Sequence, residues 1–176
     1  ILKTIVNRNK IEPLIESLGL SGKTVVVNNQ RPFAFCLGFI KPKIVLSSTL
    51  IKIMNREELT TILNHEKYHL EHKDAVVSLL AKIIQSLFPF LPLISDFVKL
   101  YRIERETKAD EQAIRTERER DSLVSALKKL LKFDNLPAFS TIPAFTGVES
   151  LEARILSLTR TKSKIRFSTF KSISLS

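Results

Sequence analysis

The feature that most constrains this chain is the run His65-Glu66-Lys67-Tyr68-His69, an HExxH motif inside a segment of helical composition. Histidines four residues apart on a helix project from the same face, so both imidazoles can bind one metal ion while Glu66 reaches a water molecule beside it. This pattern is typical of zinc-dependent peptidases. The sequence therefore predicts a helix that carries two zinc ligands, His65 and His69, and a catalytic base, Glu66.

The residues before the motif can start such a helix. Asn55 fits an N-cap, and Glu58 follows three residues later, which is the spacing of a capping box. An apolar stripe comes next, made of Leu59, Ile62 and Leu63. We expect a helix from Arg56 to about Glu71, with the motif in its second half.

A catalytic zinc site usually needs a third protein ligand. The segment from Tyr101 to Ala113 has helix-forming composition, and it offers Glu106 and Asp110 one turn apart on a single face. The neighbouring Ala109 is small, so this helix could approach the HExxH helix closely. Glu106 is therefore a good candidate for the third ligand.

The run Glu106-Thr107-Lys108-Ala109-Asp110 resembles the ExxAD segment that follows HExxH in membrane-linked glutamate-zincins. These include the HtpX-like and CAAX-prenyl endopeptidases and the BlaR/MecR-type sensor peptidases. The resemblance implies that Glu106 is the third zinc ligand and that Asp110 orients a ligand histidine. A carboxylate in this role is expected, because a zinc-bound imidazole normally donates its other ring N–H.

Three further segments are similar to BlaR/MecR-type peptidases. Ala34–Ser47 resembles the strand pair before their active helix, Asp74 matches their HExxHxxxxD extension, and Glu152–Ile155 resembles their late RI element. The resemblance covers about residues 24 to 156. It implies a zinc-dependent endopeptidase with an α+β fold, a mainly helical zincin-like domain with a small β-sheet before the HExxH helix.

Turn residues and apolar periodicity predict the order of the elements. Strands are expected over Thr24–Val27, Phe33–Phe39 and Ile44–Leu46. Helices are expected over Asn9–Leu18, Ser48–Met54, Arg56–Glu71, Asp74–Leu87, Ser95–Glu117, Asp121–Lys132 and Val148–Leu158, with Pro137 and Pro143 in the last loop. A small sheet thus precedes a run of helices.

The composition favours one compact domain. A chain of 176 residues that is 44% hydrophobic can form one core, so we expect a metallopeptidase domain over residues 1–158 and a basic, Ser/Thr-rich tail over residues 159–176. Cys36 is the one cysteine, so no intrachain disulfide can form. We expect Cys36 to pack as a small apolar side chain.

The formal net charge of +10 suggests attraction to an anionic surface. The sequence carries no aromatic or zinc-finger signature of nucleic-acid binding, so we expect no nucleic-acid partner. The most apolar stretch, Leu79 to Ile94, contains Lys82 and two prolines and is too short to cross a bilayer of about 30 Å. The chain opens at Ile1 without a signal peptide, so we expect an excised fragment or a processed product. The resemblance to BlaR/MecR-type proteins implies a domain between membrane helices, and the positive-inside tendency would place it on the cytoplasmic side.

Substrate contacts are less well defined by the sequence. The expected partner is a protein or peptide, which could pair along Phe33–Phe39 or Ile44–Leu46 as an added strand. Side chains that could stabilise the oxyanion are Tyr68, Tyr101 and Arg154, although packing and a surface ion pair are their commoner roles. His72 is expected to be solvated, and Asp74 could either cap a helix or support the site.

A different class of function stays open at this point. The domain could be a latent or non-catalytic sensor or scaffold that docks on a membrane or a protein partner. Membrane contact would then use the basic surface, the stretch from Leu79 to Ile94, or flanking segments. Glu66 argues against this alternative, because a structural zinc site does not need a general base.

Overall fold

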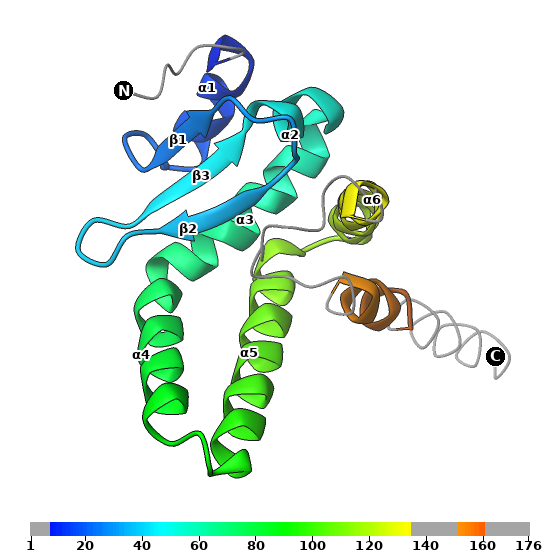
Figure 1. Ribbon diagram of the computed structural model, residues 1–176. Coiled ribbons are helices and arrows are strands. Elements are labelled where there is room, and N and C mark those ends of the chain that lie inside the picture. Colours follow the sequence, from blue (N-terminus) through cyan, green and yellow to red (C-terminus); the bar gives the residue numbers. More distant parts are fainter. Residues whose placement is uncertain (1–7, 135–150, 161–176) are drawn as a thin grey trace, which may run out of the picture.

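The computed structural model describes residues 8–134 and 151–160, and Figure 1 shows their arrangement. The labelled elements are α1 (Arg8–Ser17), β1 (Thr24–Val27), β2 (Ala34–Leu37), β3 (Lys43–Ser47), α2 (Ser48–Ile53), α3 (Arg56–Glu71), α4 (Asp74–Leu87), α5 (Pro92–Ala113) and α6 (Glu117–Asp134). Residues 151–160 are also helical. The predicted α+β class, mainly helical with a small sheet before the HExxH helix, is confirmed.

The small sheet has the strand order β1-β3-β2, with β3 in the middle. β1 runs parallel to β3, whereas β2 runs antiparallel to it. A five-residue loop joins β2 to β3, and Gly38 adopts a φ of +106° there. A Cβ atom at Gly38 would also approach the carbonyl oxygen of Lys41 to 3.2 Å, so both the backbone angle and the space favour glycine.

The main core lies between the sheet and helices α1, α2 and α3. Fully buried apolar side chains from all these elements form it, among them Ile11, Leu20, Ile44, Leu46, Leu50 and Leu63. Cys36 of β2 packs against this core. Burial, followed by the nearby charge of Glu66, raises the pKa of the Cys36 thiol, so the thiol stays protonated. The expected packing role of Cys36 is confirmed.

Helix α3 begins with the predicted capping box. The Asn55 side chain accepts a hydrogen bond from the Glu58 N–H at 2.8 Å, and the Glu58 carboxylate accepts one from the Asn55 N–H at 2.8 Å. Glu58 is 1% exposed and also accepts hydrogen bonds from Ser125 and Lys129 of α6. The cap that starts α3 therefore also joins α3 to α6.

Helices α4 and α5 form a long hairpin that projects away from the sheet (Figure 1). Lys73, at a left-handed φ of 53°, separates α4 from α3. α5 begins at Pro92, earlier than the predicted Ser95, because proline is well tolerated in the first turn of a helix. α5 also ends at Ala113, before the predicted Glu117.

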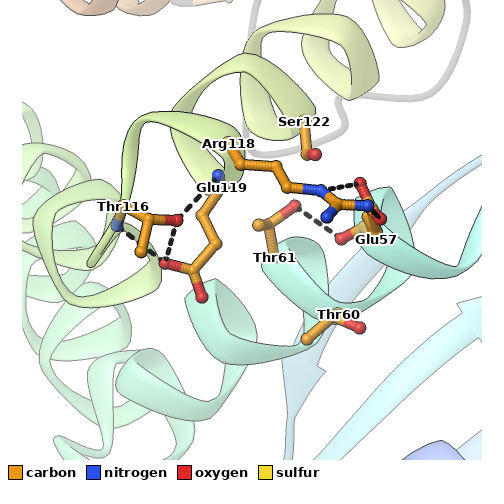
Figure 2. Close-up of a pocket in the computed structure, with 7 residues that line it drawn as sticks. All are labelled: Glu57, Thr60, Thr61, Thr116, Arg118, Glu119 and Ser122. Atoms are coloured by element: carbon orange, nitrogen blue, oxygen red, sulfur yellow. Dashed lines mark hydrogen bonds and ion pairs between the residues drawn. The ribbon is translucent and has the colours of Figure 1, made fainter.

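The break between α5 and α6 has a local cause that the sequence analysis overlooked. The Thr116 hydroxyl accepts a hydrogen bond from the Glu119 N–H at 3.2 Å, and the Glu119 carboxylate accepts one from the Thr116 N–H at 2.9 Å. This second capping box starts α6 at Glu117, earlier than predicted. Figure 2 shows it beside an open pocket, across which Arg118 of α6 pairs with Glu57 of α3.

Residues 151–160 pack on α6 through a second, smaller apolar cluster. Leu151 is buried there with Leu123 and Leu127. The predicted helix from Val148 to Leu158 agrees with the structure from residue 151 onward. Its first residues, the loop with Pro137 and Pro143, and the tail beyond residue 160 lie outside the described residues. None of the helices that the structure describes is both long and apolar enough to cross a membrane.

Candidate metal centre

Two helices bring the three predicted metal ligands together. His65 and His69 lie one turn apart on α3, and Glu106 lies on the neighbouring α5. The close approach of these helices is possible because Ala109 and Ala113 of α5 are small and fully buried. These side chains meet although Glu106 comes 37 positions after His69 in the sequence.

The ligand atoms have the spacing of a shared metal ion. Nε2 of His65 lies 3.1 Å from Nε2 of His69. The Glu106 carboxylate lies 3.5 Å from Nε2 of His65 and 3.7 Å from Nε2 of His69. Zinc–nitrogen bonds of about 2.0–2.1 Å in a tetrahedral site place two ligand nitrogens about 3.3 Å apart. Within the described ranges, this is the one group of three such side chains that could hold a metal.

Two outer carboxylates fix the orientation of the imidazoles. Nδ1 of His65 lies 2.9 Å from Asp110, and Nδ1 of His69 lies 2.7 Å from Asp74. A carboxylate accepts hydrogen bonds, so each Nδ1–H donates and each neutral ring keeps its Nε2 lone pair toward the centre. Two facing lone pairs repel each other unless a cation lies between them. This donor set therefore fits a metal ion.

Arg154, on the helix at residues 151–160, contacts the carboxylates of Asp110 and Glu106. Its Nε donates to Asp110 at 2.9 Å, and its Nη1 lies 3.0 Å from Glu106 Oε2. Oε2 of Glu106 is buried and accepts no hydrogen bond from the described residues, so the arginine contributes charge there. The interpretation of Arg154 as a surface ion pair was wrong, because its side chain is only 11% exposed.

The charges of this cluster depend on one another. Burial would raise the pKa of Glu106 and of Asp110, but interactions with His65 and with the Arg154 charge lower both to about 2. Burial and Arg154 would lower the pKa of His65, yet its interactions with the Asp110 and Glu106 carboxylates outweigh them and raise it to about 9. The two carboxylates thus favour positive charge on His65.

Asp74 supports the site and does not cap α4, since Lys73 occupies the N-cap position. Arg105 of α5 donates to Asp74 through Nη2 at 2.6 Å and lies 4.7 Å from the ring centroid of Tyr68. Burial would raise the pKa of Asp74, but hydrogen bonds from His69 and Arg105 lower it. Arg105 was not predicted from the sequence, because its partner is 31 residues away and gives no local signal.

The remaining candidates lie around this cluster. Glu66 is 8% exposed, and its backbone carbonyl accepts a hydrogen bond from Cys36 Sγ at 3.1 Å, which brings β2 next to the motif. His72 donates from Nδ1 to the Tyr68 carbonyl at 2.8 Å and is not among the ligands, as expected. Tyr68 and Tyr101 both lie beside Arg105, and their role as oxyanion donors stays a prediction.

A match to a known protein family covers all the elements that build this centre. A family model described as BlaR1 peptidase M56 matches residues 19–158. The chain belongs to the M56 peptidase family. The predicted resemblance to BlaR/MecR-type peptidases is thereby confirmed. The family supports a protease-type domain, and a peptidase acts on proteins or peptides.

A second comparison relates this M56 chain to another protease. This chain is 26% identical over 82 residues to a protein called "Protease HtpX homolog" from Thermodesulfovibrio yellowstonii (strain ATCC 51303 / DSM 11347 / YP87). The match covers 45% of this chain and 29% of the relative, so the chain spans less than a third of that protein's length. The HtpX-like side of the predicted resemblance is also supported.

Proposed function

We propose that this M56 chain is the catalytic domain of a zinc-dependent endopeptidase. His65, His69 and Glu106 would hold the zinc ion, and Glu66 would be the general base. One observation carries the proposal: two imidazole Nε2 atoms and the partly buried Glu106 carboxylate converge, while both Nδ1 atoms bind outer carboxylates. Two histidines and one glutamate with an open fourth position suit zinc better than other common divalent ions.

The proposed chemistry divides between the metal and Glu66. When bound, zinc supplies a Lewis acid that lowers the pKa of a coordinated water and polarises the scissile carbonyl. Glu66, beside His65 on α3, accepts the proton of the attacking water and delivers it to the leaving amine. Asp110 and Asp74 hold the two imidazoles in the tautomer that turns Nε2 toward the centre.

The substrate peptide would pair with the edge of β2. Both edges of β3 are already paired, so the alternative at Ile44–Leu46 is wrong for an added strand. Phe33 accepts from the Ser47 N–H, and alternation along an antiparallel pair then directs the backbone groups of Ala34 and Cys36 to the open side. This edge adjoins Glu66 through the hydrogen bond from Cys36.

The domain would work at the cytoplasmic face of a membrane. The formal net charge of +10 supports this placement, because the cytoplasmic leaflet carries anionic lipids. Fractionation of cells that produce the full-length protein, combined with protease protection of sealed vesicles, tests it. Recovery of the domain on the outer face would contradict the proposed side.

The central experiment compares the native chain with Glu66→Gln and Glu71→Gln. We expect one zinc ion per chain in all three proteins and cleavage of an unfolded protein by the native chain and Glu71→Gln alone. Glu71 is the matched control, since it is an exposed glutamate on the same helix. Zinc without cleavage in any of them would favour a latent or scaffold domain, and absence of bound metal would contradict the proposal.

A further variant, Ala34→Pro, tests the substrate edge in the same assay. It removes one N–H donor from the open side of β2, so KM should rise while kcat changes little. An unchanged KM would show that the substrate does not pair at this position.

A further inference from the structure

The α4–α5 hairpin carries most of the exposed apolar surface among the described residues. α4 has no buried residue at all, and the hairpin projects away from the core (Figure 1). Twelve of the sixteen exposed large apolar side chains lie on it: Leu79, Leu80, Ile83, Ile84, Leu87, Phe88, Phe90, Leu91, Leu93, Phe97, Leu100 and Ile103. An exposed apolar surface of this extent indicates contact with a partner or a membrane.

The tip of the hairpin lacks charge altogether. Residues 83–95 contain no Asp, Glu, Lys or Arg, and Phe90 within them is 72% exposed. Charges begin at Lys82 on α4 and at Asp96 and Lys99 on α5. A protein–protein interface normally has a polar rim around its apolar centre. An uncharged cap that includes both helix ends and the turn is better suited to a lipid phase.

The depth of this cap matches the interface of a bilayer. At about 1.5 Å of rise per residue, Lys82 lies about 8 Å from Leu87 at the end of α4, and Asp96, the first charge on α5, lies about 6 Å from Pro92 at its start. Elements that bind in the interface bury their apolar side chains to about 5–10 Å. The cap is therefore deep enough for the headgroup and upper acyl region and too short to span the bilayer.

We propose that the tip of the α4–α5 hairpin inserts into the surface of an anionic membrane. Lys82 and Lys99 are exposed just beyond the cap, near the level where lipid phosphates would lie, and Arg102 is exposed about one turn further along α5. Basic groups near an anionic surface gain attraction, and the net charge of +10 acts in the same direction. Charge complementarity therefore favours an anionic membrane over a second copy of this chain, which would carry the same positive charge.

The insertion would also position the metal centre. α4 has 14 residues, so its N-terminus lies about 21 Å from the tip. That N-terminus holds Asp74, which binds His69. If the proposed endopeptidase function holds, the site would meet substrate segments held about 12 Å from the lipid phosphates, because Asp74 lies eight residues before Lys82 on α4.

Single tryptophans test the insertion directly, because the chain contains none. Phe90→Trp places the reporter at the tip, and Ile40→Trp is the matched control at a 92% exposed site in the turn after β2. With phosphatidylcholine vesicles that contain phosphatidylglycerol, we expect a blue shift and quenching by brominated lipid for Phe90→Trp alone. Unchanged emission from the Phe90→Trp variant would overturn the proposal.

Vesicle co-sedimentation adds a quantitative test that does not depend on peptidase activity. The double variant Phe88→Ser with Phe90→Ser should bind the anionic vesicles at least about a hundredfold more weakly, given the usual contribution of two buried phenyl side chains. The control pair Phe39→Ser with Ile40→Ser should bind like the native chain, and circular dichroism should show both pairs folded. Equal binding to pure phosphatidylcholine, or a native dimer that Phe88→Ser with Phe90→Ser dissociates, would overturn the proposal.

Discussion

Asp110 joins the two halves of the candidate site, because one carboxylate accepts from His65 and from Arg154. We predict that Asp110→Asn lowers zinc affinity about 10- to 100-fold, since the imidazole loses the partner that fixes its tautomer. Asp96→Asn is the control, an exposed aspartate on the same helix. Competition with a chelator of known affinity measures the effect, and equal affinities in both variants would contradict it.

At the level of single residues, the sequence predicted side chains that belong to local patterns better than those that meet across the fold. The HExxH spacing predicts that His65 and His69 share a face, and the structure has them facing each other at 3.1 Å. The contact between Arg105 and Asp74 depends on how α5 packs against α4 and α3. Because no local spacing encodes that packing, the role of Arg105 could not be predicted from the sequence.

At the level of elements, Glu58 links the start of α3 to α6. Burial would raise its pKa, but hydrogen bonds from Lys129, the Asn55 N–H and Ser125 lower it below its usual value. Its contribution to stability is therefore full above the unfolded pKa of about 4.3 and is lost as the pH falls through the lower folded pKa. We expect Glu58→Gln to cost about 1–3 kcal/mol at pH 7, because buried hydrogen bonds to a charged group are lost.

Urea unfolding at several pH values measures this effect. The difference in unfolding free energy between the native chain and Glu58→Gln should shrink as the pH falls below about 4. The control is Glu57→Gln, one residue earlier and half-exposed, which should change stability by no more than about 0.5 kcal/mol at any of these pH values. A difference that stays constant with pH would contradict the role of the Glu58 charge.

A capping box marks the start of α3 and the start of α6, but only the first was recognised in the sequence. The box of Asn55 and Glu58 predicted the start of α3 correctly. Thr116 and Glu119 form the same pattern, yet continuous helix-forming composition led us to extend α5 to Glu117. The strand positions were predicted, whereas the order β1-β3-β2 depends on long-range pairing that the sequence does not specify locally.

At the level of the whole molecule, the proposed zinc ion would link the α4–α5 hairpin to the core. Its ligands come from α3, which packs in the core, and from α5, whose outer half is exposed. A ligand that binds only the folded state stabilises it by about 4 kcal/mol when its free concentration is about 1,000 times the dissociation constant. We therefore expect added zinc to raise the midpoint of thermal unfolding and a chelator to lower it.

Two histidine variants distinguish zinc binding at the proposed site from a general effect of metal on the stability of the protein. His69→Ala removes a ligand, so zinc should raise its unfolding midpoint much less than that of the native chain. His72→Ala removes an exposed histidine at the end of the same helix, which binds a carbonyl outside the cluster, and it should keep the full response. Calorimetry with and without zinc measures both. An equal response in the two variants would show that zinc acts elsewhere and that α3 and α5 are held together by side-chain packing alone.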